Sequence, residues 1–295
     1  MQPGHQTYPC GEGTVEIDAD GFVVGARHPA HPGLDALLTP RTAPWFGRES
    51  GWGTGFLLSS AGSGRFVRPE SLEFSADGTT SAYTPVDGLR LTVERTFGDR
   101  WRERYRLRNR RDVPVTIGSF AIHTPIADTY GPAATVLRER LHAHVWTGGA
   151  ESWLVGVRMD GTPPAFVLDL TEGELWAYSL GGRNQFTSSN IRGVVALHAT
   201  DHARAPHAFG GQPILELAPG EELVLGWEIG WYDDVDAALS GHRATVTAST
   251  LAAPIGTPVV IGAGSGADTV VESGRHGVSH IDVMVGGGRR ARVAV

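Results

Sequence analysis

The chain has 295 residues, of which 41% are hydrophobic and 19% charged, so it can bury a core and is not expected to be disordered. The formal net charge of −7 argues against a nucleic-acid partner, because phosphate binding depends on clustered positive charge. The sequence contains arginine but no lysine, which excludes lysine Schiff-base and P-loop chemistry.

Cys10 is the single cysteine, so the chain forms no intrachain disulfide and no cysteine-based metal site. We expect its thiol to be inert, in an N-terminal segment that is loosely ordered. The first residues lack the charged and apolar regions of a signal peptide, and no apolar run is long enough to span a membrane. We therefore expect a cytoplasmic protein with no membrane partner.

Short runs of alternating polar and apolar residues fill the chain, and its 40 glycines and 18 prolines separate them. This pattern is typical of antiparallel β-structure rather than of βαβ units. It predicts more than ten strands within roughly 230 residues, a number that favours two stacked sheets over a small barrel. The expected fold class is all-β, with a large two-sheet antiparallel supersandwich.

The residue composition changes after residue 244, and this change predicts a division into domains. Residues 1–244 are expected to form the supersandwich, and residues 245–257, rich in small side chains, a linker. Residues 258–295 contain about three strand-like runs, whereas an immunoglobulin-like sandwich needs about seven. We expect this last segment to be incomplete, either because the chain is the N-terminal part of a longer protein or because its tail pairs with a partner.

Residues 101–108 alternate between arginines and a mostly apolar set of side chains. The arginines occupy positions 102, 104, 106 and 108, and the other set is Trp101, Glu103, Tyr105 and Leu107. In a strand, each set lies on its own face. The arginine face is either a binding patch or a solvated sheet face paired with carboxylates of neighbouring strands.

Residues 141–146 show a similar alternation and supply the first candidate site. Three apolar side chains, Leu141, Ala143 and Val145, alternate with His142, His144 and Trp146. The second set is therefore expected on one face of a strand, as a substrate-binding surface for an oligosaccharide or polysaccharide fragment.

The residue types on this face suit sugars. An indole can stack on the C–H face of a pyranose, and imidazoles exchange hydrogen bonds with hydroxyls. The alternative is that Trp146 fills the core between the sheets. A cupin-type metal site would need a carboxylate three or four residues after His144, but Glu151 comes later, so no metal or other cofactor is expected.

The polar run of Arg183, Asn184 and Gln185 supplies further candidates for substrate binding. An arginine and two amides can reach sugar hydroxyls or the carboxylate of a uronic acid. The alternative is a plain exposed hairpin loop.

A set of turn and strand residues carries a resemblance to a known fold family. One strand ends in Leu107-x-Asn109, the next begins with Pro114-Val115, and a late Pro219-Gly220-Glu221 turn introduces a final core strand. Over residues 14–236, the chain resembles galactose-mutarotase-like β-supersandwich proteins.

The resemblance extends to the N-terminal domains of six-hairpin glycosidases, glycoside phosphorylases and polysaccharide lyases. It implies a supersandwich that packs on an (α/α) toroid, with the catalytic carboxylates on the toroid. The repeated amphipathic helices of such a toroid are not found in this sequence.

The function that this resemblance implies is a non-catalytic N-terminal domain that binds carbohydrate and supports the missing C-terminal catalytic domain of a carbohydrate-active enzyme. Association into a homodimer stays open. One alternative is a structural β protein without a ligand. Another is a free-standing sugar-binding protein or mutarotase-like epimerase, which needs an acid and a base in one cleft. Suitable side chains are His123, His198, Asp128, Asp201 and Glu228, but their spacing pairs none of them, so catalytic residues stay unassigned.

Overall fold

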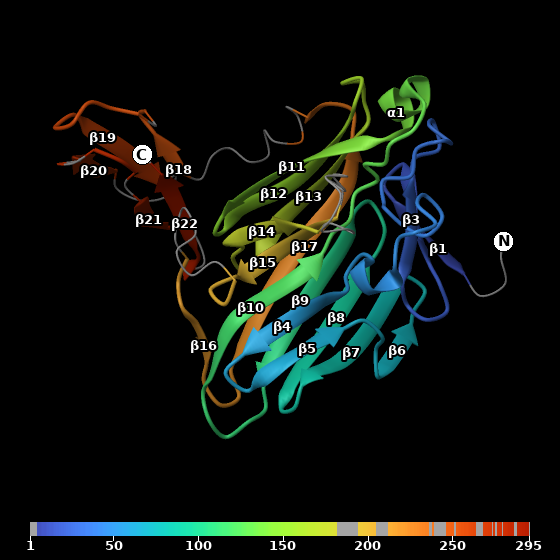
Figure 1. The fold of residues 1–295 in the computed structure, drawn as a ribbon, viewed down its shortest axis with the longest axis horizontal. Helices are drawn as coiled ribbons and strands as arrows, with labels where there is room; N and C mark the ends of the chain where they lie inside the picture. Colours follow the sequence, from blue (N-terminus) through green and yellow to red (C-terminus); the bar gives the residue numbers. More distant parts are fainter. Residues whose placement is uncertain are drawn as a thin grey trace.

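The computed structural model describes residues 5–294 except 182–193, 205–211, 236–237, 239–245, 251, 264–267, 273, 275, 279 and 286–287. Within these residues, two large antiparallel sheets face each other, with a small sheet near each terminus and a further hairpin at the C-terminal side (Figure 1). The predicted all-β class and two-sheet architecture are confirmed.

The described part of one large sheet has eight strands, with the spatial order β11-β12-β13-β17-β9-β8-β7-β6. Their bounds are β6 (Ser71–Phe74), β7 (Gly78–Val86), β8 (Leu89–Thr96), β9 (Trp101–Asn109), β11 (Leu141–Gly148), β12 (Glu151–Arg158), β13 (Ala165–Glu172) and β17 (Glu222–Tyr232). The strand β11 is thus an edge strand.

The facing sheet has the order β14-β15-β10-β4-β5, and a short strand, β16, also pairs with β10. Its strands are β4 (Gly55–Ser59), β5 (Gly62–Phe66), β10 (Val115–His123), β14 (Ala177–Leu180), β15 (Val195–Thr200) and β16 (Leu215–Leu217). We call this the six-stranded sheet.

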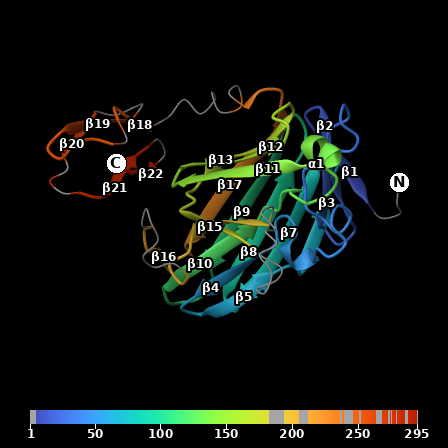
Figure 2. The ribbon, with the colours of Figure 1, turned by 45° about the horizontal axis from the view of Figure 1, so that its top comes forward.

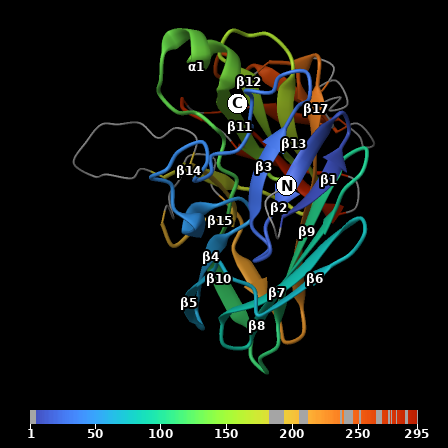
Figure 3. The same ribbon diagram turned by 90° about the vertical axis from the view of Figure 1, so that its right-hand side faces the viewer.

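The remaining elements lie at the two ends of the sandwich. Figure 3 looks onto the N-terminal end, where β1, β2 and β3 form a separate sheet, and Figure 2 shows the C-terminal strands beyond β11. The bounds are β1 (Gln6–Cys10), β2 (Gly13–Ile17), β3 (Val23–Arg27), the 3-10 helix η1 (Arg48–Ser50), α1 (Ala133–Glu139), β18 (Val246–Ala248), β19 (Pro258–Ala263), β20 (Thr269–Glu272), β21 (His280–Met284) and β22 (Arg290–Ala294). The proposed domain boundaries stay a prediction.

Cys10 lies in β1, and its position corrects one expectation about the N-terminus. β1 pairs with β2 from Gln6 onward, so this segment is not loose. The thiol is fully buried, and burial raises its pKa to about 11. Because the thiolate is the nucleophilic form, the position of Cys10 favours an inert thiol.

The core between the two large sheets contains a buried ion pair. Arg95 Nε lies 2.6 Å from Glu103 Oε1, and both side chains are at most 2% exposed. The other carboxylate oxygen of Glu103 accepts hydrogen bonds from Trp52 Nε1, Tyr105 Oη and Trp227 Nε1 at 3.2, 2.8 and 2.9 Å. Burying a charge is costly unless it is paired and hydrogen-bonded, and these partners meet that requirement for the carboxylate of Glu103. They explain how the apolar face of β9 accommodates a glutamate.

The arginines of β9 lie on the opposite, outward face of the eight-stranded sheet. Each is opposite or near a carboxylate of a neighbouring strand, in the pairs Arg102–Glu228 (2.6 Å), Arg104–Glu172 (2.7 Å), Arg106–Glu94 (3.0 Å) and Arg108–Glu222 (3.5 Å). The structure therefore favours a solvated face of cross-strand ion pairs over a basic binding patch.

The hydrogen bonds of Asn109 connect the two turns whose residues carry the fold resemblance. Its buried amide Nδ2 donates to the carbonyls of Val113, Leu217 and Ala218 at 2.9, 2.9 and 3.2 Å. Its Oδ1 accepts from the backbone N–H of Arg111 at 2.9 Å. One side chain thus joins the turn after β9 to the turn before β17, and its bonds satisfy buried backbone groups of both.

Candidate functional site

The predicted surface on β11 forms as the alternation indicated. Leu141 is buried and Ala143 and Val145 pack against the core, while His144 and Trp146 are exposed on the other face. Trp146 is 51% exposed, so it does not fill the core. Because β11 is an edge strand within the described residues, no further strand of the sheet continues this face beyond it.

The three candidate side chains on β11 lie next to one another. The imidazoles of His142 and His144 have ring centroids 4.8 Å apart and meet edge to face. His142 Nδ1 lies 4.0 Å from Asp128 Oδ2. Burial and the neighbouring His142 lower the pKa of His144, which favours its neutral form. Trp146 pairs in register with Trp153 of β12, whose half-buried ring packs against a small apolar cluster.

The other predicted binding residues, Arg183, Asn184 and Gln185, lie outside the described residues. The roles of all six predicted site residues stay predictions.

A second group of polar side chains lies on the outward face of the six-stranded sheet. A β-bulge in β10 puts them there, since the register with β4 shifts between Ile117 and Ser119. Ile117 before the bulge, and Phe120 and Ile122 after it, all belong to the core. The extra residue therefore turns Ser119 and His123 to the outward face.

The neighbouring strand β15 contributes a histidine to the same face by regular alternation. Val195, Leu197 and Ala199 belong to the core, and His198 points the other way. The ring centroid of Phe56 on β4 lies 6.2 Å from that of His123 and 5.8 Å from that of His198. The two histidines thus flank one aromatic ring.

Hydrogen bonds link His198, directly or through a serine, to four other polar residues, and we call this group the His198 cluster: Ser119, Ser179, His198, Asp201 and Arg204. His198 Nε2 lies 2.8 Å from Ser179 Oγ, and its Nδ1 lies 3.4 Å from Ser119 Oγ. Ser119 Oγ in turn donates to Asp201 Oδ1 at 3.0 Å. Direct contact between His198 Nδ1 and Asp201 Oδ1 is longer, at 3.7 Å, so Ser119 is the bridging group.

Burial determines the charge of both outward-facing histidines. It lowers the pKa of His198 to about 3, with further contributions from Arg204 and His123. It lowers the pKa of His123 to about 4, with a smaller effect of Arg65. Both imidazoles are therefore neutral near pH 7. His123 Nδ1 exchanges a hydrogen bond with Thr54 Oγ1 at 3.0 Å.

Sequence reasoning named several of these side chains as suitable types but could not group them. The structure brings His123, His198 and Asp201 to one sheet face. It places Asp128 beside His142 instead, and it pairs Glu228 with Arg102 on the other sheet. The i, i+3 spacing of His198 and Asp201 at the end of a strand could have indicated that these two side chains lie close together.

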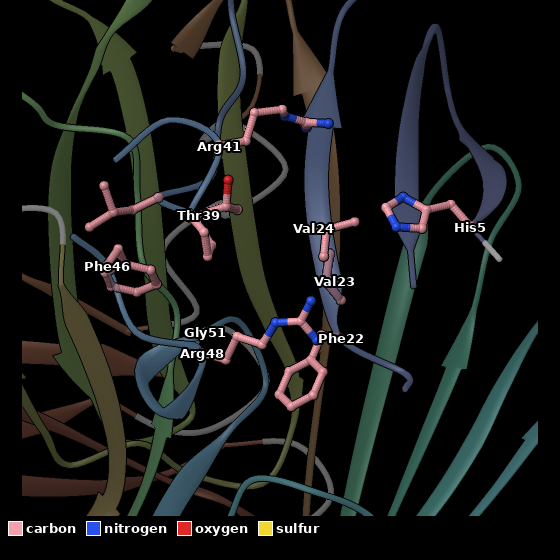
Figure 4. Close-up of a pocket in the computed structure, with 11 residues that line it drawn as sticks. His5, Phe22, Val23, Val24, Thr39, Arg41, Phe46, Arg48 and Gly51 are labelled. Atoms are coloured by element: carbon pink, nitrogen blue, oxygen red, sulfur yellow. The ribbon is translucent and has the colours of Figure 1, made fainter. Parts of the chain in front are cut away.

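A cavity of about 280 Å³ lies between β3 and the segment before β4, and no sequence pattern indicated it (Figure 4). Its walls are mostly apolar, with Phe22 and Phe46 among them. Arg41 and Arg48 also line it, but Arg41 pairs with Asp35 and Glu16, and Arg48 pairs with Asp18 at 2.9 Å. The cavity therefore offers little uncompensated charge.

The described residues include neither a metal-binding cluster nor a membrane-spanning helix. No described group of three or more histidine, cysteine or acidic side chains is arranged to hold a metal ion. Of the helices within the described part of the chain, none is long and apolar enough to cross a membrane.

Comparison with solved structures relates the chain to a polysaccharide lyase, on which it superposes with a TM-score of 0.78 at 18% identity. The match covers 98% of this chain and 46% of the lyase, so the chain spans about half the length of that protein. Lower scores relate it to a galactose mutarotase-like protein from Clostridium acetobutylicum (TM-score 0.47, 8% identity, 77% of this chain and 95% of that one) and to 4-alpha-glucanotransferase from Thermococcus litoralis (0.43, 9%, 77% and 37%).

No protein-family model matches the sequence, and no curated protein matches it. At 18% identity the likeness to the lyase concerns the fold, and the two lower scores add no argument. The predicted resemblance to a supersandwich of the kind found in polysaccharide lyases is thus confirmed at the level of the fold.

Proposed function

We propose that this chain is a carbohydrate-binding and supporting domain of a carbohydrate-active enzyme, and that a catalytic domain outside the chain cleaves the glycosidic linkage. The fold that it shares with a polysaccharide lyase supports this proposal, as does its span of 46% of that protein. The proposed sugar-binding surface is the outward face of β11, with Trp146 as the stacking platform and His142 and His144 as hydrogen-bonding neighbours.

The observation that carries this proposal is the exposure of Trp146. The Trp146 indole is 51% exposed and therefore leaves much apolar surface in water. The opposite face of the same strand packs against the core, which fixes the position of its backbone. The neighbouring His144 is also exposed, so one sugar ring can contact both side chains. Stacking on a rigidly held ring needs little ordering of the protein on binding.

The test is to measure oligosaccharide binding by Trp146→Ala and His144→Ala, first with neutral and then with uronic-acid oligosaccharides. We expect each variant to lose affinity by about tenfold or more, equivalent to about 1.4 kcal/mol. The melting temperature should stay close to that of the native chain, because both side chains are exposed. Equal affinity of Trp146→Ala and the native protein would contradict the proposed surface.

A matched control is Phe74→Ala on β6, since Phe74 is an exposed aromatic residue at the opposite edge of the same sheet. This variant should bind like the native protein. If it weakens binding as much as Trp146→Ala, the binding surface lies elsewhere on the sheet.

The supporting role is tested separately from the binding role. We expect the reading frame to encode a helical catalytic domain of several hundred residues beyond residue 295. When that domain is produced without the present chain, its polysaccharide-cleaving activity or its solubility should fall. Full activity and solubility of the separate domain would contradict the supporting role.

The mutarotase-like alternative has one observation in its favour, the histidines and Asp201 gathered on one sheet face. Mutarotation needs an acid as well as a base. Both imidazoles are neutral near pH 7, so neither is a ready acid. Following the optical rotation of a freshly dissolved single-anomer aldose tests this alternative, and acceleration that is lost in His123→Gln would support it.

A further inference from the structure

The hydrogen bonds of the His198 cluster have a fixed direction. Ser119 has one hydroxyl proton, which it donates to the carboxylate of Asp201 at 3.0 Å, so its oxygen is left to accept from His198 Nδ1–H. The imidazole is neutral, so its proton on Nδ1 leaves Nε2 as an acceptor. The hydroxyl of Ser179, 2.8 Å away, therefore donates to His198 Nε2.

This direction is the one that a serine nucleophile requires. A nucleophilic hydroxyl must donate to a general base, and a third group must orient that base. Ser179 and His198 satisfy the first condition, and Ser119 with Asp201 satisfies the second. His198 is fully buried, so Nε2 reaches a substrate only through Ser179.

Arg204 places a positive charge beside the same hydroxyl. Its Nη1 donates to Ser179 Oγ at 3.5 Å, and its Nε lies 3.9 Å from Asp201 Oδ1. The guanidinium also stacks on Phe56, with 5.5 Å between its central carbon and the ring centroid. The Arg204 side chain is 46% exposed, so it can contact a solute while it is held by these neighbours.

Ser179 itself is accessible from solvent. It lies on β14, the edge strand of the six-stranded sheet, and its side chain is half-buried. The ring of Phe56, under Arg204 and near His198, limits the room on the inner side. For this reason we expect a short acyl group to fit beside Ser179 better than a long one.

We propose that Ser179 is the nucleophile and His198 the general base of a second site, which hydrolyses carboxylic esters of small acyl groups. Ser179 Oγ attacks the ester carbonyl carbon as its proton passes to His198 Nε2. Arg204 stabilises the oxyanion, the carbon–oxygen bond to the alcohol breaks, and the alkoxide leaves and takes a proton from solvent water. Water then attacks the acyl-serine, one of its protons passes to solvent, and the carboxylic acid is released as the Ser179 oxygen regains its proton from His198 Nε2.

This activity lies on the six-stranded sheet and does not depend on the sugar-binding surface of β11. The test uses the full chain with p-nitrophenyl acetate as the probe. We expect the native protein to show a burst of p-nitrophenol followed by steady turnover. Ser179→Ala should lower kcat/KM by at least about 100-fold. A fluorophosphonate probe should label the native chain once, with the label mapped to Ser179 by peptide mass spectrometry.

Ser63→Ala is the matched control, because Ser63 is an exposed serine on β5 of the same sheet. Its rate should equal that of the native protein. Equal rates for native protein and Ser179→Ala, or labelling at another residue, would overturn the proposal. Exposed imidazoles hydrolyse the ester slowly at the same rate in the native protein and in Ser179→Ala, so this background does not affect the comparison of the two.

Ser119 is a positioning residue in this scheme, and its role has its own test. Ser119→Ala should lower kcat by about tenfold with little change in KM, because the orientation of His198 is lost while access is kept. Ser119→Thr keeps the hydroxyl and should restore most of kcat. If Ser119→Ala leaves kcat unchanged, the orienting chain through Asp201 is wrong.

Discussion

At the scale of single residues, the main feature is that charged and polar side chains are buried with well-defined partners. Arg95 and Glu103 lie inside the sandwich core, and His123 and His198 lie on the opposite face of the six-stranded sheet. Burial makes these groups sensitive to the loss of a partner or to a change of charge, since the protein interior solvates them poorly.

Removing the charge of Glu103 should destabilise the chain strongly. Glu103→Gln leaves Arg95 charged in the core without its counter-ion, for which we expect a loss of about 3–5 kcal/mol in the free energy of unfolding. Urea denaturation measures this value. Glu228→Gln is the control, because the Arg102–Glu228 pair is exposed and its loss should cost less than about 1 kcal/mol. Similar losses in both variants would show that burial is not what makes the Glu103 pair important.

The two buried histidines predict that the chain loses stability in mild acid. Their folded pKa values, about 4 for His123 and about 3 for His198, lie below the ordinary value of 6.5. The unfolded chain therefore binds protons below pH 6.5 that the folded chain does not bind. Stability is full above pH 6.5 and falls by up to about 1.4 kcal/mol per pH unit for each histidine, until the pH reaches the folded pKa.

Melting temperatures at pH 7, 6 and 5 measure this dependence. His123→Gln removes one titrating group, so its melting temperature should fall less steeply between pH 7 and 5 than that of the native chain. His276→Gln serves as the control, because His276 is exposed. An unchanged slope in His123→Gln would contradict the assignment of this pH dependence to His123.

At the scale of elements, Asn109 joins two turns that are more than a hundred residues apart in the sequence. Its amide reaches carbonyls of both turns, which fixes how the end of β9 meets the start of β17. The Leu-x-Asn and Pro-Gly-Glu patterns are therefore two halves of one contact. This contact gives a physical reason why a short pattern indicated the fold.

Asn109→Ala should destabilise the chain by about 2–4 kcal/mol, because it leaves several buried backbone groups without a partner. Chemical denaturation measures the loss. The control is Glu221→Ala, which removes a hydrogen bond to Ala218 N on an exposed turn and should cost about 0.5–1 kcal/mol. A loss below about 1 kcal/mol in Asn109→Ala would show that water replaces the amide in the turns.

At the scale of the whole molecule, the hairpin of β21 and β22 contacts the edge of the sandwich around Glu174. Glu174 accepts hydrogen bonds from the backbone N–H of Arg290 at 2.7 Å and from its guanidinium at 2.8 Å. Trp176 Nε1 donates to Glu174 as well, at 3.0 Å, and Ala150 N donates to Arg290 O at 2.7 Å. Glu174 thus links the C-terminal hairpin to the edge of the supersandwich.

Glu174→Ala should release this hairpin while the sandwich stays folded. We expect limited trypsin digestion to cut at Arg290 or Arg292 about tenfold faster or more, because local opening exposes these sites. Asp282→Asn is the control, since it removes the Arg292–Asp282 pair inside the hairpin and keeps the contacts of Glu174. Unchanged cleavage in Glu174→Ala would show that other contacts hold the hairpin.

Local patterns were sufficient to predict the fold class and one candidate surface. Alternation with period two assigns each side chain of β9 and β11 to a face, because successive side chains of a strand point to opposite sides. It therefore predicted the half-exposed Trp146 next to His144. It also indicated that the arginines of β9 lie on a single face.

Only the tertiary structure decided which residues meet. The bulge in β10 reverses the alternation after Ile117, and Gly118 lies within it, but one glycine in a strand does not determine how the partner strands are paired. Without the bulge, Ser119 would face the core and could not bridge His198 and Asp201. The sequence by itself determined the sheets and their faces through local side-chain periodicity. Pairing between distant strands, which depends on register and packing, determined the buried Arg95–Glu103 pair and the His198 cluster.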